Sequence, residues 1–419
     1  MSSASFLERD LQTPNSATQI AQRLARDGVY GVDSWHRLRG RAAPAPSEPL
    51  RAFHLPAEPL YLATGFKTLP ESSWRYLHVP ITVLLIVAIA ATAFLLYGKT
   101  TAVMTSAVAL VDPFVLAHGP VWDDVFLAAM GEWAVIAVLF AAGLSAATGH
   151  SGAWRWTLRA TVAICAAIAA AARLQSQILL AVIAALVFLF QGLRPARDLA
   201  AAAAVGAVAA VSGWTLRNLI VLGVVFPGSS HDGLTLFESN YEHARPAIFA
   251  TGTAEGLSET HLVAQFGRVA ALGEVEADKA YKAEAWQYIA AHPIEVVTTS
   301  ALKVFVSVSG FDFARSATSV RNLVTVGSQS LIVLTGLAGL WWMWGRRAND
   351  FENVLFVLFL VSAALTIGML VVGPVGMRYR ISLMGFLYIG TGALLAQSWE
   401  RLLQFSVGLR RRPRESHSV

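Results

Sequence analysis

The sequence has 419 residues, of which 55% are hydrophobic and only 14% are charged, and its mean hydropathy is +0.54. Because a soluble globular chain carries about 25% charged residues, this composition excludes a soluble domain and indicates an integral membrane protein. The formal net charge of +5 does not indicate nucleic-acid binding, since the basic residues form short clusters beside apolar runs, as they do in membrane proteins.

Residues 1–76 precede the first apolar run and contain neither a predicted span nor a signal peptide. Within them, Asn15-Ser16 can cap a helix over residues 17–26, whose apolar side chains fall on one face. A loop rich in proline and arginine follows and leads to the first span. We expect this region to form a loop and a juxtamembrane helix on the outer face of a membrane.

Nine apolar runs follow, and each is long enough, within a few residues, to cross about 30 Å of hydrocarbon as a helix. The predicted spans are Leu77–Tyr97, Thr101–His118, Asp124–Leu144, Leu158–Ala172, Gln177–Phe190, Leu199–Trp214, Leu323–Gly345, Asn353–Gly373 and Ile381–Gln397. The predicted fold class is therefore an all-α polytopic membrane protein with about nine transmembrane helices and additional amphipathic helices on its outer face.

Basic clusters fall on one side of the membrane if these spans alternate in direction. The clusters are Arg155 and Arg159, Arg194 and Arg197, Arg346 and Arg347, and the tail Arg410-Arg411-Arg412-Pro413-Arg414. Because lysine and arginine mark cytoplasmic loops, we predict that this side, with the C-terminus, is cytoplasmic.

A polar block from about 227 to 292 falls on the opposite, outer side, and its last part, Glu276–Ala291, has a helical pattern that ends at His292-Pro293. The next segment, 293–309, is only moderately apolar and contains one acidic and one basic residue. A full crossing by this segment would place the arginine-rich tail outside. We therefore predict an interfacial or re-entrant helix there.

These elements divide the chain into five parts. They are an outer-face region (1–76), a first membrane bundle (77–226), an outer-face helical segment (227–321) with the interfacial helix 293–309, a C-terminal membrane bundle (322–400) and a basic cytoplasmic tail (401–419).

The stretch Gly213–Gly223 places a tryptophan, an arginine and an asparagine where an apolar run meets the polar block. An ionisable residue at such a boundary is costly unless it snorkels to the interface or binds a ligand. Arg217 therefore has two interpretations, an interfacial anchor beside Trp214 or a ligand for an anionic group.

Acidic, cationic and aromatic residues of the outer side form the candidate site. They are Asp10, Asp123, Asp124, Arg217, Asn218, Arg378, Tyr379 and Arg380. Arginine forks match phosphate oxygens, a carboxylate can take the proton of an attacking hydroxyl or amine, and aromatic faces stack on sugars. The set suits a reaction at the membrane surface on an anionic, lipid-linked substrate.

Motifs of several other classes are missing from the sequence. It has no Gly-x-x-x-x-Gly-Lys-[Ser/Thr] loop for ATP, no His-Glu-x-x-His and no Gly-x-Ser-x-Gly. Its histidines show no pair at metal-ligand spacing on a helix, and its single cysteine, Cys165, excludes a disulfide within the chain and a cysteine-based metal site. We predict no dedicated metal site.

Eight short segments of the outer side form an ordered series along the chain. They are Asn15–Tyr30, Pro56–Tyr61, Asp112–Asp124, Ala172-Arg173-Leu174, Trp214–Asn218, Phe226–Asn240, Tyr288–Pro293 and Met377–Arg380. This series resembles that of the GT-C membrane glycosyltransferases, specifically the bacterial branch related to protein O-mannosyltransferases and aminoarabinose transferases. The resemblance implies a GT-C-like fold in the cytoplasmic (inner) membrane of a bacterium.

The resemblance also implies an enzyme that transfers a sugar from a polyprenyl-phosphate carrier to a lipid, glycan or protein acceptor at the outer face. By matching position, Arg217, Asn218, Arg378, Tyr379 and Arg380 are expected to bind the donor phosphate. The pair Asp123-Asp124 is expected to orient the acceptor or to bind a divalent cation, if the reaction uses one.

Two features depart from the family's pattern. The family carries an acid, the expected base, just before the helix of its first outer loop, but this sequence has Asn15 there, and Asp10 is the nearest acid upstream. The family's first span also has no counterpart in the sequence. Since asparagine cannot accept a proton, we consider Asp10, Asp123 and Asp124 as the catalytic acids.

Two alternatives belong to other functional classes. One is a flippase for a polyprenyl-linked sugar or another multi-span transporter, and the other is a catalytically inactive scaffold in the assembly of surface polysaccharide. A transporter should carry polar groups near the middle of the membrane. Glu132 is the clear mid-span acid here, while Asp112-Pro113 lies nearer an outer end, so the carrier is the weaker hypothesis.

Overall fold

The computed structural model describes residues 16–32, 49–119, 123–144, 152–251, 268–269, 271–311, 313, 318–346, 350–373 and 377–410. Within these ranges the chain is predominantly helical, and one isolated antiparallel bridge joins Val32 to Leu50. The helices are α2 (Ser16–Asp27), α3 (Ala57–Thr68), α4 (Glu71–Trp74), α5 (His78–Val111), α6 (Pro113–His118), α7 (Asp124–Leu144), α8 (Gly152–Ala172), α9 (Leu174–Leu189), η1 (Gln191–Ala196), α10 (Arg197–Leu222), α11 (His231–Ser239), α12 (Ala244–Thr251), α14 (Glu274–Ala291), α15 (Pro293–Ser309), α16 (Val320–Gly345), α17 (Asp350–Val372), η2 (Met377–Arg380) and α18 (Ile381–Arg410). The predicted all-α class is confirmed.

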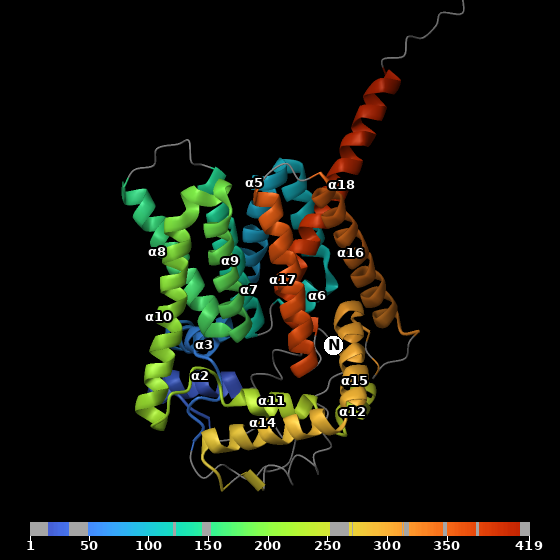
Figure 1. Ribbon diagram of the computed structural model, residues 1–419. Coiled ribbons are helices and arrows are strands. Elements are labelled where there is room, and N and C mark those ends of the chain that lie inside the picture. Colours follow the sequence, from blue (N-terminus) through green and yellow to red (C-terminus); the bar gives the residue numbers. More distant parts are fainter. Residues whose placement is uncertain are drawn as a thin grey trace, which may run out of the picture.

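Long apolar helices form a bundle that occupies most of the molecule (Figure 1). In the described part of the chain, seven helices are long and apolar enough to cross a membrane, or eight if α14 and α15 form one bent span, and α9 is a shorter apolar helix. Side chains on the bundle surface are apolar: Val205 and Leu334 are each 67% exposed and Ile220 is 75% exposed. The chain is therefore a multi-pass membrane protein.

The first two predicted spans are the two arms of α5, which folds back at Gly98. This residue has φ 81° and ψ −176°, a conformation that only glycine adopts readily. At the far end of the two arms, the Thr82 hydroxyl donates to the Gly119 carbonyl oxygen at 2.7 Å, so the chain has returned to its starting side. With α5 divided at Gly98 and α9 included, each of the nine predicted runs corresponds to helical structure in the bundle.

Helices α7 and α18 form the centre of the bundle. In their most apolar windows, 72% and 67% of the residues are buried, against 28% in α8, α10 and α16. The Trp133 indole of α7 donates to the Ser382 carbonyl of α18 at 3.2 Å and lies over Gly385, where an added Cβ would come within 2.3 Å of the ring. This close packing fixes the position of the beginning of α18 relative to α7.

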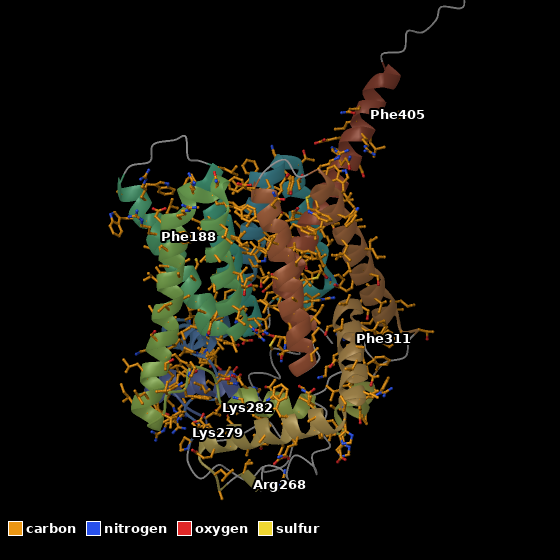
Figure 2. All side chains as sticks on the ribbon, in the orientation of Figure 1. Phe188, Arg268, Lys279, Lys282, Phe311 and Phe405 are labelled. Carbon is orange, nitrogen blue, oxygen red and sulfur yellow. The ribbon has the colours of Figure 1, made fainter. Side chains whose placement is uncertain are left out.

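A second layer, which we call the cap layer, consists of α2, residues 49–56, α11, α12 and α14. Figure 1 shows α11 and α14 lying across one end of the bundle, on the same side as α2. The layer has an apolar core of its own, which includes Ile20, Phe53, Leu234, Phe237 and Tyr281. Figure 2 shows that Lys279 and Lys282 lie on α14, and that Arg268 lies at the same end of the molecule. The polar residues predicted on one side of the membrane are thus gathered on one layer.

The segment 293–309 forms α15, which turns by 105° from α14. In Figure 1, α15 runs beside α16 and α17, so it leaves the cap layer and packs along the bundle. Its buried Lys303 ammonium donates to the carbonyl oxygen of Ser239, the last residue of α11, at 2.7 Å and to that of Gly373, which follows α17, at 3.1 Å. Helix C-termini carry partial negative charge, and the contact therefore joins the cap layer to the bundle.

Candidate functional site

The pair Asp123-Asp124 lies at the start of α7, on the cap-layer side of the bundle. The Asp123 carboxylate accepts the backbone N–H of Val125 at 3.0 Å, which satisfies one of the free donors at the beginning of the helix. The carboxylate of Asp123 is 5% exposed, whereas that of Asp124 is 36% exposed. The pair therefore combines a buried acid with one that solvent reaches.

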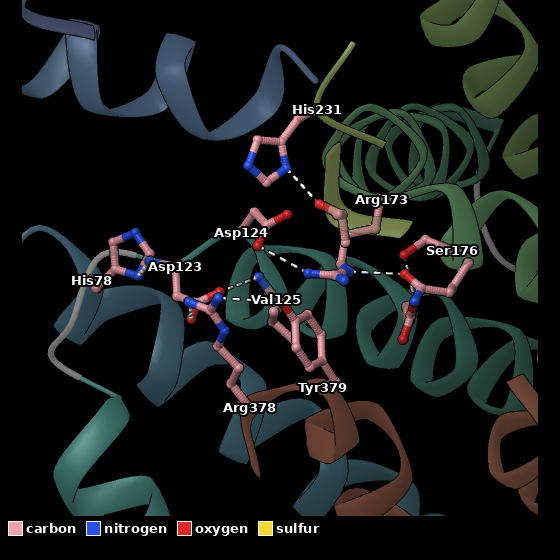
Figure 3. Close-up of polar contacts among 12 residues, drawn as sticks. His78, Asp123, Asp124, Val125, Arg173, Ser176, His231, Arg378 and Tyr379 are labelled. Atoms are coloured by element: carbon pink, nitrogen blue, oxygen red, sulfur yellow. Dashed lines mark hydrogen bonds and ion pairs between the residues drawn. The ribbon is translucent and has the colours of Figure 1, made fainter. Parts of the chain in front are cut away.

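Each aspartate pairs with a different arginine (Figure 3). Arg173 donates to the Asp124 Oδ1 at 3.0 Å, and Arg378 donates to the Asp123 Oδ2 at 3.3 Å. Arg173 is the residue between α8 and α9, and its extended backbone, with φ −150° and ψ 145°, breaks the helix there and directs the side chain toward α7. Arg378 belongs to η2, immediately before α18.

Tyr379 lies between the two arginines. Its ring centroid is 4.9 Å from the guanidinium carbon of Arg173 and 5.1 Å from that of Arg378, and its hydroxyl accepts a hydrogen bond from Arg378 at 3.2 Å. Planar guanidinium groups stack favourably on aromatic rings. The tyrosine thus keeps two positive charges close together beside two carboxylates. We call Asp123, Asp124, Arg173, Arg378 and Tyr379 the acid–arginine centre.

The electrostatics of Asp123 favour its ionised form. Burial by itself raises the pKa of this carboxyl, but the Arg378 charge and hydrogen bonds from neighbouring groups outweigh burial, and the pKa lies below its usual value. The Asp123 backbone N–H also donates to the Nδ1 of His78 at 3.4 Å. Asp123 is therefore a negatively charged, firmly held part of the centre.

Glu58, in the first turn of α3, is a third carboxyl beside this centre. The residue is 6% exposed, and its Oε1 has no hydrogen-bond partner within the described part of the chain. Burial raises the pKa of Glu58 well above its usual value, and the negative charges of Asp124 and Asp123 raise it further, against the opposing effect of Arg378 and Arg173. In the sequence, this residue belongs to the segment Pro56–Tyr61 and had no predicted role.

Histidine rings adjoin the centre on two sides. His78 begins α5 beside Asp123, and its ring packs edge to face with Tyr61 of α3, with ring centroids 5.9 Å apart.

His231 adjoins the centre from the cap layer. Figure 3 shows His231, at the start of α11, on the other side of Asp124 from Tyr379. Its Nδ1 is hydrogen-bonded to the Thr235 hydroxyl at 2.8 Å, and its ring stacks on His54 with centroids 5.2 Å apart. The cap layer thus contributes flat rings above the centre.

Arg217 lies in a different set of contacts. Its guanidinium donates to the Arg51 carbonyl at 2.6 Å and to the Asn218 side-chain oxygen at 2.9 Å, and it stacks against Tyr30 and Trp214, with guanidinium-to-ring distances of 5.0 and 4.9 Å. These contacts hold the N-terminal part of the cap layer on the end of α10. Phosphate binding by Arg217 stays a prediction, and a phosphate would have to compete with these partners.

Asn218 and Trp214 fix the chain that follows α10. The Asn218 amide donates to the Phe226 carbonyl at 2.8 Å, and the Trp214 indole donates to the Gly228 carbonyl at 3.0 Å. Both contacts stabilise the connection to α11. The predicted role of Asn218 in donor binding is likewise a prediction, and its buried amide already has a structural partner.

The three predicted residues of η2 have different environments. Arg378 and Tyr379 belong to the acid–arginine centre, but the Arg380 guanidinium turns into the bundle and donates to the Gln329 side-chain oxygen and the Val308 carbonyl, both at 2.5 Å.

The contacts of Arg380 continue into a buried network. Gln329 in turn donates to Asp112, which also accepts a hydrogen bond from the Tyr388 hydroxyl. This buried network joins α6, α15, α16 and α18, so Arg380 has the contacts of a structural residue.

Asp10 and Asn15 lie outside the described residues. In the described ranges, no group of three or more His, Cys, Asp or Glu side chains is arranged to hold a divalent cation. The two aspartates of the centre already carry an arginine each. We therefore derive no step that depends on a metal ion.

Four of the five members of the centre, Asp123, Asp124, Arg378 and Tyr379, were candidate residues in the sequence. The fifth, Arg173, entered only through a segment of the family resemblance. Glu58 could have been singled out by its position in the sequence. A position between two prolines at the start of an apolar helix is unusual for an unpaired charge. Only the packing of α3 against α7 and α8 brings it to the centre.

Two solved structures of archaeal oligosaccharyltransferase have a similar fold. The oligosaccharyltransferase of Archaeoglobus fulgidus in its apo form matches with a TM-score of 0.52 and 14% identity over 93% of this chain and 48% of that chain. The archaeal oligosaccharyltransferase AglB from the same organism, in complex with an inhibitory peptide and a dolichol-phosphate, matches with a TM-score of 0.50 and 13% identity over 95% and 48% of the two chains. ArnT from Cupriavidus metallidurans gives a TM-score of 0.37 and 16% identity over 91% and 71%.

These similarities concern the fold. The chain spans about half the length of the oligosaccharyltransferases that it matches, and neither a family model nor a curated protein sequence matches it. At such low identity the agreement in structure shows a shared architecture and leaves the reaction open. The chain shares the polytopic helical fold of these oligosaccharyltransferases, in agreement with the GT-C-like fold that its ordered outer-side segments predicted.

Proposed function

We propose that this protein is a glycosyltransferase that moves a sugar from a polyprenyl-phosphate-linked donor to an acceptor at the membrane face that carries the cap layer. The observation that supports this proposal is the acid–arginine centre, in which two arginines and two aspartates meet around Tyr379 at the boundary between bundle and cap layer. A lipid-linked phosphate reaches such a boundary with its chain still in the bilayer.

The two guanidiniums suit the phosphate of the donor. Arg173 and Arg378 together present a forked set of N–H donors, and a phosphate that leaves the sugar carbon gains negative charge. Both arginines are now paired with aspartates, one at 3.0 Å and one at 3.3 Å. A phosphate group would replace part of these contacts, because its oxygens accept the same N–H donors.

Asp124 suits the acceptor. It is the more exposed carboxylate of the pair, and binding of the phosphate by Arg173 would free it to orient the attacking hydroxyl or amine. Asp123 stays charged and holds Arg378 in place. The histidine and phenylalanine rings of the cap layer supply flat faces of the kind that stack on sugars, and Phe53 and His231 lie 4.7 Å apart edge to face.

The proposal includes the cellular setting. We propose a bacterial cytoplasmic membrane, with the C-terminus in the cytoplasm and the cap layer on the outer side. The basic clusters Arg155 and Arg159, and Arg194 and Arg197, belong to the beginning of α8, to η1 and to the beginning of α10, and these lie at the end of the bundle opposite the cap layer (Figure 1). Lipids, glycans and proteins are the acceptor classes that such a site can serve.

The test is transfer of a radiolabelled sugar from a polyprenyl-phosphate donor by the purified protein in proteoliposomes, with extracted envelope lipid, glycan and protein as acceptors. Asp124→Asn should reduce transfer by about 100-fold or more, since a positioned carboxylate typically contributes at least that factor. The control is Glu276→Gln on the exposed side of α14, which should transfer as the wild type does. Equal transfer by Asp124→Asn and the wild type would contradict the assigned role.

A carrier makes a different prediction in the same vesicles. A flippase would move the lipid-linked sugar across the bilayer without forming a sugar–acceptor product. Glu132, the mid-span acid, is buried and accepts a hydrogen bond from the Ser176 hydroxyl at 2.6 Å, so it has a partner within the bundle. Movement of donor without product would favour the carrier over the transferase.

A further inference from the structure

Glu58 differs from the two aspartates of the acid–arginine centre in having no cationic partner among the residues that the structure describes. Asp123 and Asp124 each accept a hydrogen bond from an arginine, but the buried Oε1 of Glu58 accepts none. A buried, ionised carboxylate without a partner is very costly, whereas a neutral carboxylic acid is not. The local arrangement therefore favours a protonated Glu58.

The contacts of α3 place Glu58 beside the centre. One turn further along this helix, the Tyr61 hydroxyl donates to the Leu77 carbonyl, and the Tyr61 ring faces His78 at 5.9 Å. His78 in turn accepts the backbone N–H of Asp123 at 3.4 Å. Side chains three residues apart lie on the same face of a helix, so Glu58 and Tyr61 share the face that meets α5 and α7.

The charges around Glu58 do not balance. Among the described residues, three carboxyls, Glu58 among them, face two guanidiniums: Asp124 and Asp123 disfavour the ionised form of Glu58, and Arg378 and Arg173 favour it. Each arginine is already paired, which leaves one carboxyl in excess. Burial and the two neighbouring aspartates raise the pKa of Glu58, in agreement with its being the carboxyl that keeps its proton.

We propose that Glu58 acts as a general acid, which donates its proton to the phosphate oxygen released when the sugar–phosphate bond breaks. This proposal rests on the sugar transfer proposed above. The bond between the sugar carbon and the phosphate oxygen breaks, its electron pair stays on that oxygen, and the Glu58 proton moves to the phosphate. The acceptor oxygen or nitrogen bonds to the sugar carbon and loses its own proton to Asp124, which passes the proton to water, and water later returns a proton to Glu58.

Glu58 and the donor phosphate have the same two arginines as neighbours. Arg173 and Arg378 are the groups that suit the donor phosphate, and both also act electrostatically on Glu58. A phosphate held by them brings a further negative charge within electrostatic range of Glu58, and this charge favours the protonated carboxyl. Asp123 cannot fill this role, because its pKa is lowered and it has no proton to give.

The first experiment compares Glu58→Gln with the wild type in the proteoliposome transfer assay. Glutamine keeps the size and an N–H donor but cannot release a proton. We expect kcat to fall by about 100-fold, as for loss of a general acid, while KM for the donor changes little. In the wild type kcat should fall as the pH rises through the pKa of Glu58, and this alkaline decrease should be absent in Glu58→Gln.

Two variants control this experiment. Glu71→Gln removes an exposed carboxyl of α4 and should leave kcat and its pH dependence unchanged. Glu58→Asp restores a carboxylic acid and should recover part of kcat. A Glu58→Gln variant with wild-type kcat and a wild-type pH profile would overturn the proposal.

The second experiment measures the proton without any turnover. The infrared difference spectrum between the wild type and Glu58→Gln at neutral pH should contain the C=O stretching band of a protonated carboxylic acid. A difference spectrum with only the carboxylate bands would overturn the assignment of Glu58 as an acid. If the wild type transfers no sugar but the acid band is present, the proposed function fails while the protonation of Glu58 stands, so the two failures are distinguishable.

Discussion

Arg173 lies against the face of Tyr379, with its guanidinium carbon 4.9 Å from the ring centroid, while the same guanidinium donates to Asp124 at 3.0 Å. The two residues are far apart in the sequence: one lies in the break between α8 and α9, and the other in the turn before α18. Their contact ties the first membrane bundle to the last helix. It also sets how close the two positive charges of the centre can approach.

Arg173→Lys should retain the positive charge but lose the planar fork and most of the stacking on Tyr379. We expect transfer from the polyprenyl-phosphate donor to fall by about 10- to 100-fold, in line with a loss of 1.4 to 2.8 kcal/mol in transition-state binding. The initial rate in proteoliposomes measures this effect. Arg194→Lys, in the exposed part of η1, is the matched control and should transfer normally. Equal rates for both variants would contradict a phosphate-binding role for Arg173.

Arg217→Ala separates the two interpretations of this residue. Because the guanidinium holds the Arg51 carbonyl and stacks on Tyr30 and Trp214, we expect its loss to lower the free energy of unfolding by about 2 kcal/mol. Thermal unfolding in detergent would show this loss, and KM for the donor would stay near its wild-type value below the transition. A raised donor KM with unchanged thermal stability would instead support the predicted phosphate contact.

The raised pKa of Glu58 makes stability depend on pH in a defined direction. Above about pH 4.3 a glutamate of the unfolded chain loses its proton. The folded protein keeps this proton up to the raised pKa, so the folded state binds more protons and stability falls as the pH rises through this window. Glu58→Gln should remove this decrease and unfold at a higher temperature at neutral pH. A pH profile that runs parallel to that of the wild type would contradict the assignment.

Gly98→Ala should destabilise the hairpin of α5. With φ 81° and ψ −176°, Gly98 has a backbone conformation that costs other residues about 1 to 3 kcal/mol. Gly213→Ala in α10 is a close control, because an added Cβ meets no atom within 4 Å at either site and Gly213 has helical backbone angles. Alanine there should stabilise the helix by about 0.5 to 1 kcal/mol. Opposite changes in unfolding temperature are expected, and a loss of stability in Gly213→Ala as large as that in Gly98→Ala would contradict this account.

Several parts of the fold could be predicted because they depend on local pattern. A span needs about 20 apolar residues whatever its neighbours are, and so the runs that became α7, α16 and α17 could be recognised from composition alone. The helix 293–309 and its sharp change of direction followed from His292-Pro293, because proline ends the preceding helix. The Asp123-Asp124 pair was recognisable as two acidic residues at the beginning of a predicted span.

Other parts depended on which distant segments meet. The sequence places Arg378, Tyr379 and Arg380 next to one another, yet Arg378 faces Asp123 while Arg380 turns to Gln329, since the η2 turn points successive side chains in different directions. The position of Arg217 at the end of an apolar run predicted a ligand for an anionic group, a role that stays a prediction. Only the packing of the cap layer showed that its guanidinium also contacts the Arg51 carbonyl and two aromatic rings.

The sequence by itself determined that this is a membrane protein of apolar helices, with its polar and chemically active residues gathered at one end, because hydrophobic length and charge clustering are local properties. Only the tertiary structure decided which charges meet. Arg173 binds Asp124 and stacks on Tyr379, and the unpaired Glu58 is buried beside them, because α3, α7, the α8–α9 break and η2 pack at one point. Whether a charged side chain is paired, and whether it keeps its proton, depends on such neighbours and on burial, which no linear pattern contains.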